Sequence, residues 1–180
     1  IEGRHHGLPL GILFSLTAAL FFIELYVPYL AHAPVESWYE NILWNMAEWR
    51  SEFTVNDFAV AFPILGWHFQ PALIPIVAVY WPFRDAVQWL YFLQAVGVAL
   101  TVWPVFLLAR HILGRTPEAV LLACAFAFHP LLHMGQLISV SPDALAVPVI
   151  AWGLYAFVVG RPGWGVALMM TAVGLKETVA

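Results

Sequence analysis

Charged residues are scarce in this chain, and their scarcity sets the first limit on its class. Only 10% of the 180 residues are charged and 62% are hydrophobic, whereas soluble domains average about a quarter charged residues. This composition predicts an integral membrane protein surrounded by membrane lipids. The net charge of −4 comes with no basic patch, so nucleic acid is excluded as a partner.

Cysteine and the short motifs of common enzymes are also nearly absent. Cys124 is the single cysteine, so an intrachain disulfide and a cysteine-based zinc site are excluded. Its apolar neighbours make it a small core residue. The sequence contains no Gly-rich phosphate loop and no nucleophile elbow. No metal ligands are predicted from these features.

Long apolar runs, in contrast, make up most of the chain. A helix needs about 20 apolar residues to cross a bilayer, and the candidate spans are 9–30, 86–109, 118–137, 144–159 and 163–180. The sequence therefore predicts an all-α polytopic membrane helix bundle, with about five transmembrane helices in a single domain over 9–180. Residues 1–8 are predicted to be a cytoplasmic segment or a tag remnant, because Ile1–Arg4 reads as a protease site. The abrupt end of the last run indicates a truncated sequence.

The predicted outer loop, residues 31–85, contains two further helical segments. In Val35–Arg50 the apolar residues form one broad stripe and polar residues the opposite one, which is typical of a helix lying in the membrane interface with its polar side toward water. The apolar stripe comprises Trp38, Tyr39, Ile42, Leu43, Met46 and Trp49, and the polar one comprises Ser37, Asn41, Asn45, Glu48 and Glu52. Gln70–Trp81 is apolar but only about 12 residues long and proline-rich, so it is predicted to be re-entrant or interfacial.

The positive-inside rule gives the predicted orientation. With five spans, Arg4, Arg110, Arg115 and Arg161 all lie on one side of the membrane, which is therefore the cytoplasmic side and carries the N-terminus. Most acidic residues then lie outside. If Gln70–Trp81 crossed the bilayer, this bias would vanish.

A few polar residues within the apolar runs require partners. Glu24 is expected to pair with Arg84 or Lys176, or to reach the lipid headgroups. His129 and His133, four residues apart, have a spacing that could hold a metal, a haem or a pigment, although Pro130 between them favours packing or hydrogen bonding to other helices. Gln94 is predicted to form an interhelical hydrogen bond.

Several short motifs follow one another in a characteristic order. They are "ILWN" in the loop helix, His68-Phe69-Gln70-Pro71, "LLARHILGR" at the end of one span, "SPDALAVP" at the start of the next, and Gly174-Leu175-Lys176-Glu177. From about Glu36 to Glu177 the chain resembles an uncharacterised family of bacterial and archaeal multi-pass membrane proteins related to the GT-C glycosyltransferases. That family usually carries an acidic pair, mostly Asp, near the first loop helix. Glu40 matches its second position, and Glu36 lies one residue from the first.

The resemblance implies sugar transfer from a polyprenyl-phosphate sugar at the outer membrane face. Under this reading Glu40 is the catalytic base, Glu36 its helper and His68 an orienting donor. Arg84 and Lys176 would bind the phosphate, with Glu177 and Asp143 as further substrate-binding residues, and a divalent cation could share that work. The simpler interpretation of Glu36 and Glu40 is a solvated helix face.

A second hypothesis is a non-catalytic accessory subunit of a larger membrane protein complex. Members of the resembled family are longer, with several further spans and an outer domain, so this chain corresponds to their front half. The nine tryptophans favour contact with other membrane subunits, because aromatic residues are enriched at interfaces. In that case the aromatic stripe of Trp38, Trp49 and Trp81 would be covered by other chains.

Overall fold

A computed structural model describes residues 7–30, 38–48, 70–83, 87–136 and 140–175 of the chain. Throughout these ranges the regular structure is helical and contains no strand, so the predicted all-α class is confirmed. Four of the helices are α1 (Gly7–Leu30), α2 (Trp38–Ala47), α4 (Leu73–Tyr80) and α5 (Val87–Ala99), and a short 3-10 turn, η2 (Trp81–Phe83), follows α4. The others are α6 (Val102–Leu113), α7 (Thr116–Ala127), α8 (Pro130–Gln136), α9 (Pro142–Val158) and α10 (Pro162–Leu175).

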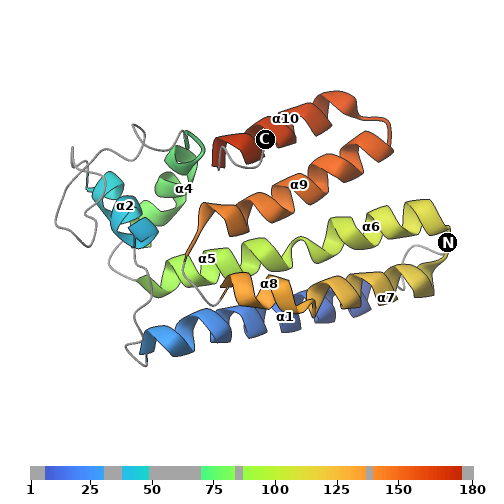
Figure 1. Cartoon of the computed structure of the whole chain (residues 1–180), viewed down its shortest axis with the longest axis horizontal. Helices are drawn as coiled ribbons and strands as arrows, with labels where there is room; N and C mark the ends of the chain where they lie inside the picture. The colour runs from blue at the N-terminus through green and yellow to red at the C-terminus, as the bar shows by residue number, and fades with distance from the viewer. Residues whose placement is uncertain (1–6, 31–37, 49–69, 84–86, 137–139, 176–180) are drawn as a thin grey trace.

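The long helices lie side by side, while α2 and α4 cover one end of the bundle (Figure 1). Helix α1 packs along α5, α6 packs on α7, and α9 packs against α5, α6 and α10. Three buried alanines, Ala119, Ala123 and Ala127, form a small-residue stripe that faces α6. Such stripes allow close helix packing where the hydrophobic effect cannot hold helices together.

One helix in the described ranges is long and apolar enough to cross a membrane. It runs from Gln88 to Leu113, 26 residues, or about 39 Å at the usual rise, and combines α5 and α6. It ends at Gly114, whose positive φ of 66° lets its N–H bond the Arg110 carbonyl. The other apolar helices found there have 10–17 described residues. A bundle of five spans is therefore a proposal rather than an observation.

The predicted helix over 118–137 is wrong as one continuous element. Helix α7 ends at Ala127, and α8 starts afresh at Pro130 and is only seven residues long. Proline lacks the N–H that a continuing helix would use, and its ring clashes with the preceding turn. Helix α4 is also short, with eight residues, or about 12 Å, against a hydrocarbon core of about 30 Å.

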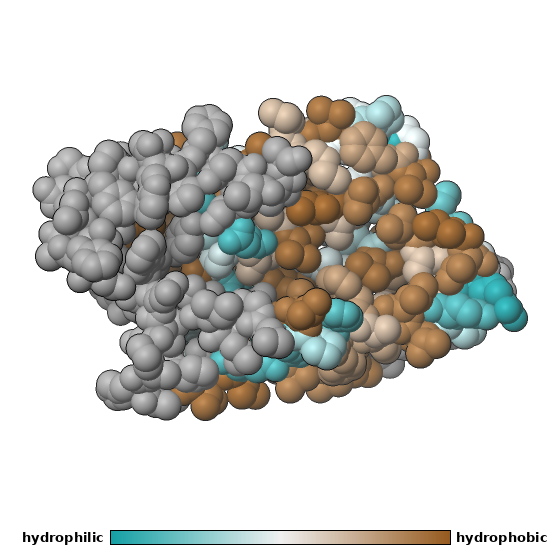
Figure 2. All heavy atoms as spheres, viewed as in Figure 1, coloured by the Kyte–Doolittle hydropathy of each residue, from teal (hydrophilic) through white to brown (hydrophobic). Residues whose placement is uncertain are grey.

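On the face seen in Figure 2, most of the described surface along the bundle is apolar. Large hydrophobic side chains project outward along the helices, for example Ile12 (53% exposed), Leu121 (69%) and Met170 (64%). A soluble monomer rarely exposes such extended apolar area. Lipid tails are the surroundings in which this surface is stable.

The described arginines lie at the end of the bundle opposite α2 and α4. Arg110 is in the last turn of α6, Arg115 precedes α7, and Arg161 precedes α10. The α6–α7 and α9–α10 turns both lie at the right-hand end in Figure 1. The bundle thus has a basic end and a second end where the loop helices α2 and α4 lie.

Candidate functional site

The two most specific motif segments meet at the loop-helix end of the bundle. Ala72, which follows the His68–Pro71 motif, donates its backbone N–H to the carbonyl of Gly174, with an N···O distance of 3.0 Å. Gly174 is buried, and a Cβ atom there would lie 3.5 Å from the Ala72 Cβ. The start of α4 and the end of α10 are therefore in direct contact, although about 100 residues separate them.

Helix α9 completes this contact. Ala146 of α9 packs with Ala172 and Leu175 of α10, and Ala72 and Ile76 of the α4 segment pack against them. All three of these α9 and α10 residues are at most 4% exposed. The residues before Lys176 and Glu177 are thus held against the segment after His68 by a backbone hydrogen bond and a buried apolar cluster.

Helix α2, which carries Glu40, packs on α4 and on the start of α5. Ile42 and Leu43 are 1% and 2% exposed and lie in one cluster with Leu73, Tyr80 and Leu90. Asn45 is also buried, at 6% exposed, although it belongs to the stripe predicted to face water. Asn45 therefore departs from the predicted water-facing stripe, because α2 buries residues of both stripes.

Asp143 has a structural role at the first turn of α9. The Ser141 hydroxyl accepts a hydrogen bond from the Asp143 backbone N–H at 3.2 Å and donates one to the Asp143 carboxylate at 3.1 Å. This is an N-terminal cap, and an acidic side chain there also suits the positive end of the helix. Gln94 of α5 accepts the Ser141 backbone N–H at 2.7 Å, which confirms its predicted interhelical hydrogen bond.

Glu24 pairs with His133, while Arg84 and Lys176, its predicted partners, lie outside the described residues. The His133 Nδ1 lies 2.8 and 2.9 Å from the two carboxylate oxygens of Glu24, and its Nε2 lies 2.8 Å from the Ala127 carbonyl oxygen. Phe21 covers the imidazole, with ring centroids 4.8 Å apart. Both ring nitrogens are engaged, so His133 has none left for a metal, and the predicted hydrogen-bonding role is confirmed.

The acceptors around His133 determine where its protons lie. A carbonyl oxygen only accepts, so Nε2 must carry a proton. Nδ1 faces a carboxylate, so it either donates to ionised Glu24 or accepts from protonated Glu24. In both cases one proton lies between α1 and α8, and the pair joins the end of α1 to the segment after the Pro130 break.

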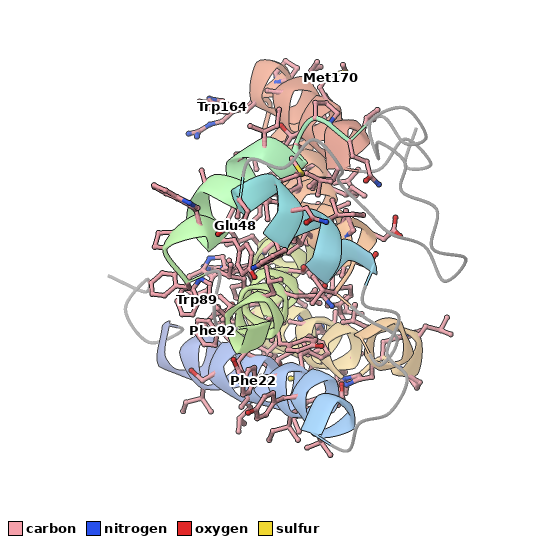
Figure 3. All side chains as sticks on the ribbon, turned by 90° about the vertical axis from the view of Figure 1, so that its left-hand side faces the viewer. Phe22, Glu48, Trp89, Phe92, Trp164 and Met170 are labelled. Carbon is pink, nitrogen blue, oxygen red and sulfur yellow. The ribbon has the colours of Figure 1, made fainter. Side chains whose placement is uncertain are left out.

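A chain of aromatic rings lies beside the loop helices. Trp89 stacks on Phe92 with centroids 5.2 Å apart and contacts Phe83 at 4.3 Å, and Phe92 meets Phe22 edge-on at 6.3 Å. Figure 3 shows Phe22, Phe92 and Trp89 in line beside α2. In the described part of the chain, the buried Trp89 indole N–H has no hydrogen-bond acceptor. Such a cluster is typical of a membrane interface.

Most of the predicted site residues fall outside the described ranges. Glu36, His68, Arg84, Lys176 and Glu177 all lie there, and of Glu40 only the backbone, within α2, is described. Between residues 7 and 175, the described parts contain no group of three or more metal-binding side chains. The assignment of these residues to a site therefore stays a prediction.

Sequence reasoning predicted hydrogen bonds for Gln94 and His133 but did not identify their partners, Ser141 and Glu24. One signal was available, because a carboxylate inside an apolar helix needs a partner. His133 lies in another apolar run, where its spacing from His129 suggests a shared site with that residue instead. Only the break at Pro130 places it beside α1.

Comparison with known proteins identifies one related group. A family model described as "Predicted membrane protein (DUF2079)" matches residues 36–176. No curated protein and no solved structure gives a significant match.

Proposed function

The chain belongs to the DUF2079 family of predicted membrane proteins, and from this premise we propose that it is a multi-pass cell-membrane protein with a GT-C-like site for sugar transfer. The site lies at the loop-helix end of the bundle. Its donor is a polyprenyl-phosphate sugar. The observation that carries the proposal is the hydrogen bond from Ala72 to Gly174, since it joins the two motif segments on which the resemblance is strongest.

The proposed orientation follows from the basic end. Arg110, Arg115 and Arg161 are near helix ends on that side, and positive residues favour the cytoplasm. The loop-helix end then faces outward, and the N-terminus is cytoplasmic. The apolar sides of the bundle support the membrane placement.

The proposed chemistry assigns one step to each group. The Glu40 carboxylate, assisted by Glu36 and oriented by His68, takes the proton of the acceptor hydroxyl. The hydroxyl oxygen bonds to the anomeric carbon, and the bond from that carbon to the phosphate oxygen breaks. Polyprenyl phosphate leaves with the electron pair, and Arg84 and Lys176 bind its charge. Glu177 and Asp143 would contact the sugar, and a carboxylate-held divalent cation could assist the leaving group.

The donor's lipid tail requires a site at the membrane boundary. The aromatic cluster of Phe22, Phe92, Trp89 and Phe83 lies beside α2 and is partly exposed, with Phe92 43% and Phe83 46% accessible. Aromatic side chains favour the boundary between headgroups and tails. This cluster would let a tail remain in lipid while the sugar phosphate reaches the loop.

The test is release of polyprenyl phosphate by the purified protein in liposomes containing a radiolabelled polyprenyl-phosphate sugar and membrane acceptors. We expect Glu40→Gln to lower the rate at least about 100-fold, because general-base catalysis contributes about that much. The matched control is Glu118→Gln, which removes a carboxylate paired with Arg115 at the opposite end of the bundle. A rate unchanged in Glu40→Gln would exclude Glu40 as the base.

A non-catalytic accessory subunit is the alternative. Trp81 is 52% exposed beside α4, which leaves a large aromatic surface uncovered at the proposed outer end. A photocrosslinking residue at position 81 would distinguish the two functions in native membranes. Stoichiometric crosslinking to one membrane protein, with no polyprenyl phosphate release from any donor, would favour the subunit; crosslinking to lipid alone would exclude it.

A further inference from the structure

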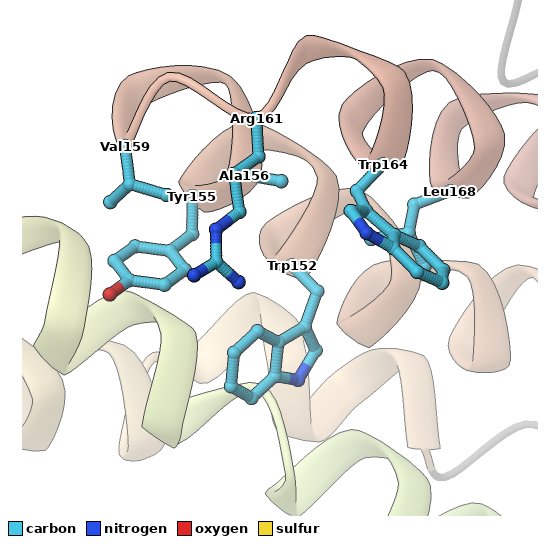
Figure 4. Close-up of a pocket in the computed structure, with 7 residues that line it drawn as sticks. All are labelled: Trp152, Tyr155, Ala156, Val159, Arg161, Trp164 and Leu168. Atoms are coloured by element: carbon cyan, nitrogen blue, oxygen red, sulfur yellow. The ribbon is translucent and has the colours of Figure 1, made fainter.

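A cleft with one arginine and three aromatic rings opens at the basic end of the bundle, far from the proposed sugar site. It has a volume of about 360 Å³ and lies at the turn between α9 and α10 (Figure 4). It is lined by Trp152, Tyr155, Ala156, Val159, Arg161, Trp164 and Leu168. Figure 4 shows the Arg161 guanidinium between Tyr155 and Trp152. Trp164 lies beyond Trp152, on the side away from Tyr155.

The backbone of the turn holds Arg161 in place. Gly160 has a positive φ of 75°, and the Arg161 N–H bonds back to the Ala156 carbonyl at 2.8 Å. These are features of a Schellman helix end. Pro162 then begins α10, as proline commonly does at the first helical position. The Arg161 side chain therefore extends from a hydrogen-bonded turn.

Two sources of positive potential meet in the cleft. Arg161 is the only charged residue between 144 and 175, and among the described residues no carboxylate forms an ion pair with it. The first backbone N–H groups of α10, on Gly163 and Trp164, have no acceptor within the helix. Guanidinium and helix N-terminus both favour an anion with several oxygen atoms.

The surroundings of the cleft indicate that this anion is attached to a lipid. Trp152 and Trp164 line the cleft, and tryptophan side chains favour the headgroup level of a bilayer. Trp164 is 68% exposed, and Leu168, one turn further along α10 on the same side, lines the cleft with it. A phosphate bound by Arg161 would thus have its acyl chains against an apolar helix face.

We propose that the α9–α10 cleft binds the phosphate group of an anionic phospholipid in the leaflet at the basic end of the bundle. Arg161 binds the phosphate through two N–H groups, the α10 N-terminus supplies further donors, and Trp152 and Trp164 flank the headgroup. This site depends on the bundle lying in a membrane but is independent of sugar transfer. Basic pockets between helices on the cytoplasmic side are known to bind anionic headgroups.

The experiment counts lipids on the delipidated protein by native mass spectrometry, with phosphatidylglycerol, phosphatidylcholine and glycerol phosphate as probes. We expect one phosphatidylglycerol to bind at least about tenfold more tightly than phosphatidylcholine, and Arg161→Gln to remove at least about tenfold of that affinity. Arg161→Lys should fall between the two, because lysine keeps the charge without the paired N–H geometry.

Arg115→Gln is the matched control, because Arg115 is exposed at the same end of the bundle. An equal loss in Arg115→Gln would show general surface attraction and overturn the proposal. Displacement of the lipid by glycerol phosphate at comparable concentration would also overturn it, because the site would then bind free phosphate esters. Arg161→Gln must elute as a single species of unchanged size, and thermal shift by phosphatidylglycerol provides a second measurement on each variant.

Discussion

At the scale of single residues, the Glu24–His133 pair shows how an ionisable group is accommodated in an apolar helix. The two side chains are only 28% and 18% exposed, so their hydrogen bonds are largely shielded from water. Removing one partner leaves the other without its hydrogen bonds, and this costs more than the net strength of the bonds. The pair also joins α1 to α8, two helices that are far apart in the sequence.

We expect Glu24→Ala to lower the free energy of unfolding by about 1–3 kcal/mol, measured by thermal unfolding in detergent. Glu24→Gln should be less harmful, because its amide can still donate to Nδ1 of a neutral imidazole while Nε2–H keeps the Ala127 carbonyl. In Glu24→Ala combined with His133→Ala the losses should be less than additive. Additive losses would show that the pair is energetically uncoupled.

At the scale of elements, α9 and α10 form a hairpin that depends on small residues. A Cβ on Gly165 would lie 2.8 Å from ring atoms of Phe157, and one on Gly153 would lie 3.0 Å from the Met169 methyl. Both distances are too short without a shift of the neighbour. Helices in a membrane associate through such close packing, since lipid tails are as apolar as their side chains.

Gly165→Leu should therefore lower the free energy of unfolding by about 1–3 kcal/mol through overpacking. Gly163→Leu is the matched control, because no heavy atom lies within 4 Å of its added Cβ and its surroundings are open. The check is the thermal unfolding temperature of both variants in the same detergent. Equal temperatures for the two variants would contradict close α9–α10 packing as a source of stability.

At the scale of the whole molecule, the proposed topology separates Arg110, Arg115 and Arg161 from the loop helices. Gln88 and Arg115 are exposed at opposite ends of the α5–α6 helix, which is long enough for the hydrocarbon core plus part of each interface. The apolar sides between these ends agree with that placement.

Single-cysteine labelling checks this topology in a Cys124→Ala background. A membrane-impermeant maleimide should label Gln88→Cys in intact cells, and it should label Arg115→Cys only after permeabilisation, because the arginine end is proposed to be cytoplasmic. Labelling of both positions from the same side would refute the spanning helix. The reverse pattern would refute the orientation while leaving the span intact.

The sequence by itself determined the membrane class and the helical fold, because a low charge content and long apolar runs leave few other stable structures. It also predicted that Gln94 and His133 would hydrogen-bond to other helices. Its prediction that Asn45 faces water was wrong, because periodicity reports which residues share a face and not what covers that face. Asn45 is buried although its stripe is polar.

Only the tertiary structure decided which distant residues meet. Contacts between residues 24 and 133, or between Ala72 and Gly174, depend on how the helices stack, and helical spacing along one segment carries no information about that. The break at Pro130 also redirects the chain, so that His133 meets α1. The Arg161 cleft likewise arises only when the ends of α9 and α10 are folded against each other.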